Sequence, residues 1–200
     1  MSRLLLIRHG PTAWNEAGRI QGRSNTPLSP AGRAAVAGWV LPPSATDARW
    51  ICSPLARARE SAEILHGGPV AAEPRLIETD WGAWEGRTLA ALRAEFGAEM
   101  ATNEARGLDF RPPGGESPRD VQQRLQPLLE SLAETAGSVV AVTHKGVIRA
   151  VYALASGWDM QAQPPAKLIN ACVQVFTLAA GGTPRIEALN LPLRAGCQRP

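Results

Sequence analysis

The hydrophobic positions along this chain fall into short apolar runs, separated by longer segments in which apolar residues recur with helical spacing. Short apolar runs bounded by polar residues predict strands buried on both faces, as in a parallel sheet. Such runs occur at residues 4–7, 50–52 and 139–142, and a further short strand is predicted at 69–72. The segment 172–178 alternates apolar and polar residues, and we expect it to pair with a strand at 186–189.

Helix signals occupy the segments between these strands. The Ser-Pro pairs at 29–30 and 53–54 each offer a serine N-cap followed by proline at the first helical position. They predict helices that run to about residue 40 and to residue 65. A long amphipathic helix is predicted from Pro118 to about Thr135, with one apolar face. That face consists of Val121, Leu125, Leu128, Leu129 and Leu132. Shorter helices are predicted at 89–96 and 147–155, and a Pro/Gly-rich loop at 111–117.

This alternation of strands and helices predicts an α/β fold with a mostly parallel central sheet. The chain of 200 residues shows no internal repeat and no linker composition, so we expect one domain over residues 1–200. Its tail, residues 194–200, is expected to be loose.

Charge and cysteine content narrow the function classes. The formal net charge is +3, without a basic run or interleaved aromatic residues, so a nucleic-acid partner is not expected. Cys52, Cys172 and Cys197 show neither a disulfide pattern nor a CxxC metal pair, which is typical of a reduced, cytoplasmic protein. No apolar stretch is long enough to predict a membrane span or a signal peptide, so a membrane partner is not expected either.

Two of the three histidines follow buried strands directly. His9 comes after the apolar run at 4–7, His144 comes after the run at 139–142, and a glycine lies close behind each. Ligands bind at the carboxyl ends of the strands in open α/β sheets, so these histidines are candidate site residues. A hydrogen-bonded structural role is the alternative for either one. His66 precedes a Gly-Gly pair, and we interpret it as a cation at a helix C-terminus.

Two arginines join the histidines at the same predicted edge. Arg8 immediately precedes His9, and Arg57 lies in the first turn of the helix after the second buried strand. Arginine forms bidentate hydrogen bonds with phosphate oxygens, so two histidines and two arginines at one sheet edge favour a phosphoryl group as ligand.

The motifs around these residues resemble those of the histidine phosphatase superfamily, the phosphoglycerate-mutase-like enzymes. Residues 8–12 (RHGPT) match its RHG signature, and further matching blocks follow in family order between about residues 3 and 155. These blocks are Asn15, Gln21-Gly22, residues 26–29 (TPLS), 53–58 (SPLARA), 76–86 (LIETDWGAWEG), 114–117 (GGES) and 142–144 (VTH).

The resemblance implies a three-layer α/β/α sandwich and a phosphatase that hydrolyses small phosphomonoesters through a covalent phosphohistidine. His9 would be the nucleophile, and Glu78 the proton donor. Arg8, Arg57 and His144 would bind the phosphoryl oxygens, and Asn15 and Gln21 would line the phosphate pocket. Glu85 matches a structural position of the family. The partner would be a phosphorylated small molecule, and no metal ion or cofactor is expected.

Two positions depart from the family pattern. Pro11 stands where many members have an acidic residue, and Lys145 stands where a Gly-Gly pair often follows the second histidine. Lys145 either is a solvated surface residue or contacts an anionic part of the substrate. The identity of the substrate and the oligomeric state stay open.

Other functions also stay open at this point. Within the family they are a cofactor-dependent phosphoglycerate mutase and a narrow phosphatase of the α-ribazole phosphate type. The segment between Glu78 and His144 is short and largely occupied by predicted helices and a loop, so little chain remains for the lid that a mutase needs. Outside the family, a non-catalytic phosphate-binding module would be expected to lack His9 or Glu78. A metallohydrolase would be expected to show HxH or HExxH spacing, which is absent here.

Overall fold

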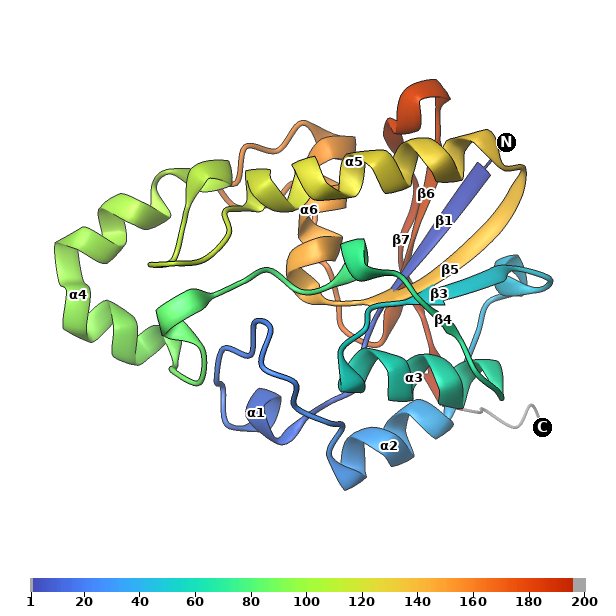
Figure 1. Ribbon diagram of the computed structural model, residues 1–200, viewed down its shortest axis with the longest axis horizontal. Helices are drawn as coiled ribbons and strands as arrows, with labels where there is room; N and C mark the ends of the chain where they lie inside the picture. Colours follow the sequence, from blue (N-terminus) through green and yellow to red (C-terminus); the bar gives the residue numbers. More distant parts are fainter. Residues whose placement is uncertain (1, 196–200) are drawn as a thin grey trace.

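The computed structural model describes residues 2–195 and is organised around a six-stranded sheet (Figure 1). The strand order is β4-β3-β5-β1-β6-β7. The strands are β1 (Ser2–Arg8), β3 (Arg49–Cys52), β4 (Ala71–Ala72), β5 (Gly137–Thr143), β6 (Cys172–Leu178) and β7 (Pro184–Pro192). The first four in chain order pair in parallel, and β6 and β7 add two antiparallel strands. All the predicted strands are therefore present, and the mostly parallel sheet is confirmed.

The apolar run of β1 serves both faces of this sheet. Leu4 and Leu6 pack into one buried cluster, whereas Leu5 and Ile7 pack into the cluster on the opposite face. All four side chains are at most 2% exposed. Successive side chains of a strand point to opposite faces, so a strand covered on both sides must be apolar at every position.

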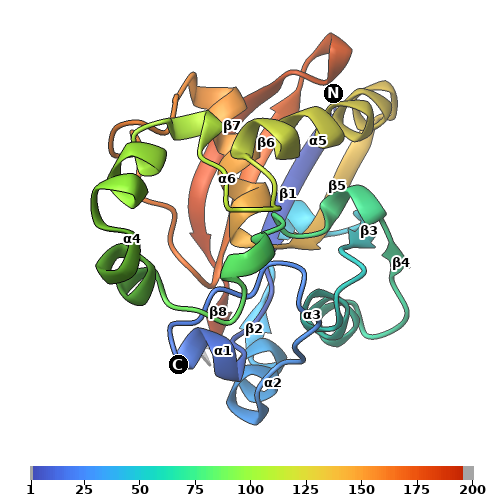
Figure 2. The ribbon, with the colours of Figure 1, turned by 60° about the vertical axis from the view of Figure 1, so that its left-hand side comes forward.

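Helices cover the two faces and complete a three-layer sandwich (Figures 1 and 2). The helices α5 (Pro118–Glu134) and α6 (Lys145–Ser156) pack on the face that holds Leu4 and Leu6. On the other face, α3 (Ala56–His66) contributes Ala58 and Ala62 to the cluster, and α2 (Pro30–Ala37) packs against α3. The predicted apolar face of α5 is buried at all five positions.

The structure corrects the predicted end of α2 and part of the predicted tail. The helix ends at Ala37 with Gly38 as its C-cap, and does not continue to residue 40. The next residues form β2 (Trp39–Val40), which pairs with β8 (Arg194–Ala195). The prediction of a loose tail is therefore wrong for these two residues, because they complete a second, two-stranded sheet. Residues 196–200, including Cys197, lie outside the described residues; Cys52 and Cys172 are free and buried.

Three further segments differ from the predicted boundaries. The helix α3 begins at Ala56, and its N-cap residue Leu55 makes no capping hydrogen bond through its side chain, so Ser53 is not the cap. The helix α4 (Leu89–Glu104) extends well past the predicted end at 96, and is interrupted at Gly97, where φ is 47°. The helix α6 starts two residues earlier than predicted, directly after His144.

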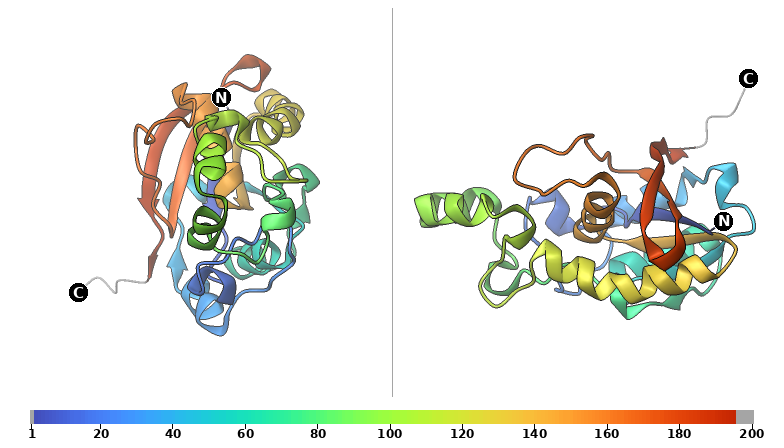
Figure 3. Two further views of the ribbon diagram at one scale, coloured as in Figure 1. Left: turned by 90° about the vertical axis from the view of Figure 1, so that its left-hand side faces the viewer. Right: turned by 90° about the horizontal axis from the view of Figure 1, so that it is seen from above.

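The short helix α1 (Ala13–Glu16) and α4 lie on the same side of the molecule, in front of the sheet in the view that faces this side (Figure 3, left). In Figure 1, α4 projects furthest from the sheet. Among the described residues, no helix combines the length and the apolar character that crossing a membrane requires.

Candidate active site

Three neighbouring parallel strands end at the candidate site. His9, Ser53 and His144 directly follow β1, β3 and β5, and β5 lies between the other two in the sheet. The register continues past the strand ends, because the His9 backbone N–H donates to the Thr143 carbonyl at 3.0 Å. The ring centroids of His9 and His144 are 5.2 Å apart. The strand order thus brings together two histidines that are distant in the sequence.

The geometry of His9 leaves one ring nitrogen free. The side chain is only 6% exposed, and Nδ1 lies 2.6 Å from the carbonyl oxygen of Gly10. A carbonyl oxygen only accepts, so Nδ1 carries the hydrogen and Nε2 keeps its lone pair. Burial lowers the pKa of His9 well below its usual value, and the cations of Arg8 and Arg57 lower it further. His9 is therefore a neutral imidazole with an available Nε2.

His144 is fully buried beside His9, and Ser53 contacts its ring. Nε2 of His144 lies 2.7 Å from the Ser53 hydroxyl. Its Nδ1 is buried and has no hydrogen-bond partner among the described residues. Burial lowers the pKa of His144, and the neighbouring His9 and Arg57 add to this shift. The sequence interpretation of Ser53 as a helix cap missed this contact, although Ser53 follows a buried strand just as both histidines do.

Arg57 is a completely buried cation held by backbone carbonyls. Its Nη2 donates to the Gly22 carbonyl at 2.7 Å, and its Nη1 donates to the Ser24 carbonyl at 2.8 Å. Burial lowers its pKa to about 10, so the guanidinium stays charged at neutral pH. Arg8 is half-buried and donates Nη1 to Oδ1 of Asn170 at 2.7 Å. Both arginines reach the candidate site from the elements that the sequence predicted.

Glu85 supports the turn that holds Arg57. Its carboxylate accepts hydrogen bonds from the backbone N–H groups of Arg23 at 2.6 Å and of Ser24 at 2.9 Å. Gly22 has a φ of +52°, and a Cβ there would collide with the Glu85 carboxylate, so the turn requires glycine. Glu85 does not line the active-site cavity. It therefore acts on Arg57 through the backbone of the turn.

The Glu78 carboxyl group is hydrogen-bonded both to the residue that follows it and to the first turn of α6. Its Oε1 accepts from the backbone N–H of Thr79 at 2.9 Å, and its Oε2 accepts from the backbone N–H of Gly146 at 3.3 Å. A Cβ at position 146 would collide with Thr79 Oγ1 and Glu78 Oε1, so only glycine permits this approach. The carboxyl group is thereby held at the end of the sheet that carries both histidines.

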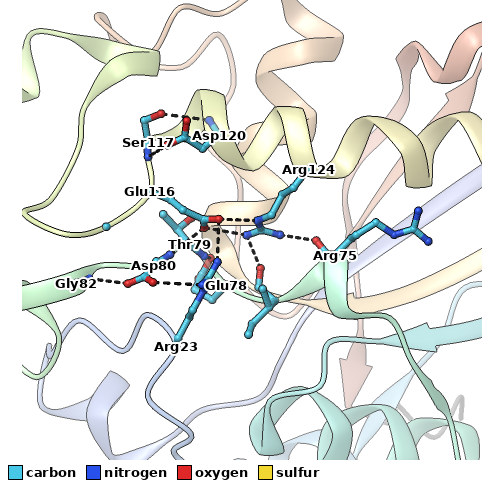
Figure 4. Close-up of polar contacts among 12 residues, drawn as sticks. Arg23, Arg75, Glu78, Thr79, Asp80, Gly82, Glu116, Ser117, Asp120 and Arg124 are labelled. Atoms are coloured by element: carbon cyan, nitrogen blue, oxygen red, sulfur yellow. Dashed lines mark hydrogen bonds and ion pairs between the residues drawn. The ribbon is translucent and has the colours of Figure 1, made fainter.

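Two charged residues anchor the backbone on either side of Glu78 (Figure 4). Arg124 of α5 donates Nη2 to the carbonyl of Ile77 at 2.7 Å. Glu116 accepts from Nε of Arg124 at 3.1 Å and from the backbone N–H of Asp80 at 3.1 Å. The segment that carries Glu78 is therefore attached to α5 both before and after the carboxylate.

Arg23 joins this arrangement to the turn at residues 22–24. Its Nη2 donates to Glu116 at 2.8 Å, and its Nη1 lies 3.3 Å from the Asp80 carboxylate. Because the Arg23 backbone also binds Glu85, the support of Glu78 and the support of Arg57 form one connected network. The sequence motifs named these acidic residues, but only the structure reveals which of them face the cavity.

Asn15 and Gln21 also line the cavity of the candidate site. Oδ1 of Asn15 accepts from the Thr12 backbone N–H at 3.1 Å, in a capping box at the start of α1. Oε1 of Gln21 accepts from the hydroxyls of Thr12, at 3.0 Å, and of Thr26, at 2.5 Å. Since the side-chain oxygens are occupied, the amide nitrogens are the groups that remain to donate to a ligand.

A cavity of about 750 Å³ opens onto these side chains. It is lined by Arg8, His9, Asn15, Gln21, Arg57 and Glu78, and the fully buried His144 contacts the cavity through its neighbour His9. The segment between Glu78 and His144 adds a wall that the sequence did not predict, made of Leu89, Arg93, Glu104 and Phe110. Within residues 2–195, no three His, Cys, Asp or Glu side chains are grouped so that they could hold a metal ion.

The unpartnered buried nitrogens of the described structure concentrate at this site. Five buried side-chain nitrogen or oxygen atoms lack a hydrogen-bond partner, and three are Arg8 Nε, Arg57 Nε and His144 Nδ1. The two arginine nitrogens are donors, and Nδ1 of His144 is a donor in the tautomer in which Nε2 accepts from the Ser53 hydroxyl. A buried polar group without a partner costs free energy, so a cluster of unpartnered donors indicates a ligand that accepts. An oxyanion with several equivalent oxygens, such as a phosphoryl group, meets that requirement.

Comparison with known proteins agrees with this site. The family model of the histidine phosphatase superfamily (branch 1) matches residues 4–192. A glucosyl-3-phosphoglycerate phosphatase of Mycolicibacterium vanbaalenii is 37% identical over 177 residues, which cover 81% of this chain and 77% of that protein. The 2,3-bisphosphoglycerate-dependent phosphoglycerate mutase 2 of Gloeobacter violaceus is 32% identical over 162 residues, or 76% of this chain and 74% of that protein.

Solved structures show the same architecture. A mycobacterial glucosyl-3-phosphoglycerate phosphatase in complex with VO3 matches with a TM-score of 0.80 and 32% identity, covering 96% of this chain and 100% of that one. YhfR of Bacillus stearothermophilus matches with a TM-score of 0.80 and 28% identity, covering 94% and 96% of the two chains. The chain therefore belongs to the histidine phosphatase superfamily. Within it, the chain is a phosphoric monoester hydrolase with the phosphoglycerate-mutase-like fold.

Proposed function

We propose that this enzyme hydrolyses small phosphomonoesters by way of a phosphohistidine on His9. The observation that carries the proposal is the free Nε2 of a neutral His9 beside three orphaned donors, those of Arg8, Arg57 and His144. Attack on phosphorus requires an unprotonated imidazole nitrogen, and the low pKa of His9 keeps it available. The named activities of the mycobacterial relatives support a phosphorylated small metabolite as the substrate class.

In the first step Nε2 of His9 forms a bond to phosphorus as the bond from phosphorus to the ester oxygen breaks. Arg8, Arg57 and His144 donate to the equatorial oxygens, where the transition state carries its charge. Arg57 is fixed by burial and by two backbone carbonyls, His144 by burial and the Ser53 hydroxyl, and Arg8 by the Asn170 side chain, so these donors need little reorganisation during the reaction. Asn15 and Gln21 bind the phosphoryl group through their amide nitrogens.

Glu78 supplies the proton that the leaving alkoxide requires. A positioned acid of this kind contributes roughly 10²–10⁴-fold to the rate. In the second step a water molecule attacks the phosphohistidine and passes a proton to the Glu78 carboxylate. The bond between Nε2 and phosphorus then breaks, and inorganic phosphate and neutral His9 are released.

Trapping the intermediate tests this proposal. Acid is avoided during the quench, because a phosphohistidine is acid-labile and base-stable. Enzyme mixed with labelled substrate and quenched in base is expected to carry label on His9, and His9→Ala is expected to carry none and to lose turnover. Label on another residue, or an active His9→Ala enzyme, would refute the assignment.

A phosphoglycerate mutase is the second candidate, favoured by the similarity to the Gloeobacter enzyme. The catalytic residues would be the same, and only the fate of the phosphohistidine would differ. Incubation with 3-phosphoglycerate and catalytic 2,3-bisphosphoglycerate separates the two activities. We expect phosphate release to exceed formation of 2-phosphoglycerate; faster interconversion than phosphate release would identify a mutase.

A further inference from the structure

A second cavity, of about 390 Å³, adjoins the active-site cavity. The two are continuous, because Arg8, Lys145, Arg149 and Trp158 line both. Lys145 directly follows His144 and is the first residue of α6. Its backbone therefore lies next to the candidate phosphoryl site. The smaller cavity extends from there along α6 toward the segment 163–170, which precedes β6.

The walls of this second cavity carry positive charge without a matching negative charge. Lys145 and Arg149 lie one turn apart on α6, and Lys167 faces them from the segment before β6. Lys145 and Lys167 are the two lysines of the whole sequence. No Asp or Glu of the described residues lines the cavity, and none of the three cations forms an ion pair within residues 2–195.

Many arginines elsewhere on the surface form ion pairs, whereas Arg19, Arg49, Arg106 and Arg185 form none within residues 2–195. Arg23, Arg33, Arg93, Arg111 and Arg119 each pair with a carboxylate within 3.3 Å. Like charges that share a site repel one another, so an unpaired group of cations is costly unless an anion binds there. The pKa of Lys145 is lowered by burial and then by the cations of Arg8 and Arg149, whereas the Glu78 carboxylate raises it.

Trp158 packs against the guanidinium of Arg149, and both residues line the second cavity. The guanidinium carbon of Arg149 lies 4.8 Å from the ring centroid of Trp158, in a cation–π contact that holds the plane of the group. Trp158 itself is fixed by a hydrogen bond from its indole N–H to the Ala162 carbonyl at 2.9 Å. Within residues 2–195 no hydrogen bond or ion pair uses the donors of Arg149, so its planar guanidinium suits a carboxylate or a phosphate.

We propose that the substrate carries a second anionic group, a carboxylate or a second phosphate, and that Lys145, Arg149 and Lys167 bind it. The inference rests on the proposed function, and it adds the class of substrate: a phosphomonoester with a second negative charge a few bonds from the phosphoryl group. The departure from the family pattern at Lys145 is then a determinant of specificity. Arg8, which lines both cavities, lies between the two anions.

Matched substrate pairs test the inference. The first pair is 3-phosphoglycerate and glycerol 3-phosphate, in which a carboxylate replaces a hydroxymethyl group. The second pair is propane-1,3-diyl bisphosphate and propyl phosphate, in which a phosphate replaces a hydrogen. We expect kcat/KM to be at least tenfold higher for one or both anionic members, and the preferred pair identifies the anion.

Substitutions then show which residues cause the preference for the anionic substrate. Lys145→Met, Arg149→Met and Lys167→Met are each expected to lower the ratio of kcat/KM within the preferred pair about tenfold, and Lys167→Arg is expected to retain it. Arg185→Met is the control, because it removes the same charge at the start of β7, beside the strand end opposite to the active site. Thermal melting of each variant checks that it is folded.

Hydrolysis of p-nitrophenyl phosphate separates the two possible failures. If the wild-type enzyme hydrolyses neither this substrate nor any member of the two pairs, the proposed function itself is wrong. If any of these substrates is hydrolysed, and the anionic members show no preference, the second-anion site is refuted. It is also refuted if the wild-type enzyme prefers an anionic member and the three Met variants keep the same ratio of kcat/KM as Arg185→Met.

Discussion

The imidazole rings of His9 and His144 lie 5.2 Å apart at an interplanar angle of 57°, and both belong to side chains that are at most 6% exposed. Two adjacent imidazolium ions in such a place would repel each other and the nearby cations of Arg8 and Arg57. Burial and these neighbours accordingly lower the pKa of both rings. The pair is neutral in the folded protein at neutral pH, which has consequences for stability as well as for catalysis.

The first prediction is a loss of stability on mild acidification. Below about pH 6.5 the unfolded chain binds protons on these two histidines, whereas the folded protein does not. The free energy of unfolding therefore falls with decreasing pH, by up to about 1.4 kcal/mol per pH unit for each histidine. The fall continues until the pH reaches the lowered pKa of the folded state. Melting temperatures measured between pH 7.5 and 5 report this slope.

Replacing one histidine shows how much of the pH dependence of stability that histidine contributes. His9→Asn is expected to remove part of the pH dependence. A wild-type melting temperature that stays constant between pH 7 and 5.5 would contradict the burial of two neutral histidines.

The second prediction separates the two glutamates of the 76–86 motif. Glu78→Gln is expected to lower kcat by about 10²–10³-fold for an alkyl phosphate, because the alkoxide then leaves without a proton. The loss should be much smaller for p-nitrophenyl phosphate, whose leaving group needs little assistance. Glu85→Gln should affect both substrates alike and lower the melting temperature, since it weakens the turn that holds Arg57. A larger leaving-group effect from Glu85→Gln than from Glu78→Gln would reverse the assignment.

The third prediction concerns the support of Glu78 from α5. Arg124→Gln and Glu116→Gln remove anchors of the backbone at Ile77 and Asp80. Each should lower kcat for an alkyl phosphate about tenfold more than for p-nitrophenyl phosphate, which is the signature of a misplaced acid.

Arg119→Gln is the matched control for this experiment, because Arg119 lies on the same helix in an exposed ion pair with Asp109. It is expected to leave the substrate ratio unchanged. Equal losses with both substrates for Arg124→Gln would show that the residue serves stability alone.

The fourth prediction is that activity survives removal of divalent metal ions. In the proposed mechanism, Arg8, Arg57 and Nδ1 of His144 supply the positive charge and hydrogen bonds that a metal ion would otherwise bring to the phosphoryl oxygens. Steady-state rates before and after exhaustive dialysis against EDTA should agree within experimental error. A loss that zinc or magnesium restores would favour a metal-assisted mechanism.

Much of this enzyme follows from local sequence patterns. Strands covered on both faces must be apolar at successive positions, so the runs at 4–7, 50–52 and 139–142 indicated a mostly parallel sheet. The polar residue after such a strand lies at the sheet edge, which identified His9 and His144 as candidate site residues, and the strand order then made them neighbours. The RHG motif and its companion blocks then indicated the family, because several short motifs in the same order are far more specific than any one of them.

The tertiary structure decided which contacts are made by residues that the local sequence pattern does not distinguish. Ser53 has the sequence signature of a helix cap, yet it binds His144, because β3 and β5 are neighbours in the sheet. Glu78 and Glu85 occur in one motif, but only Glu78 lines the cavity. Hydrophobic periodicity reports which residues are buried and not which partners they meet. Those partners depend on strand order and on how α5 and α6 pack over the sheet.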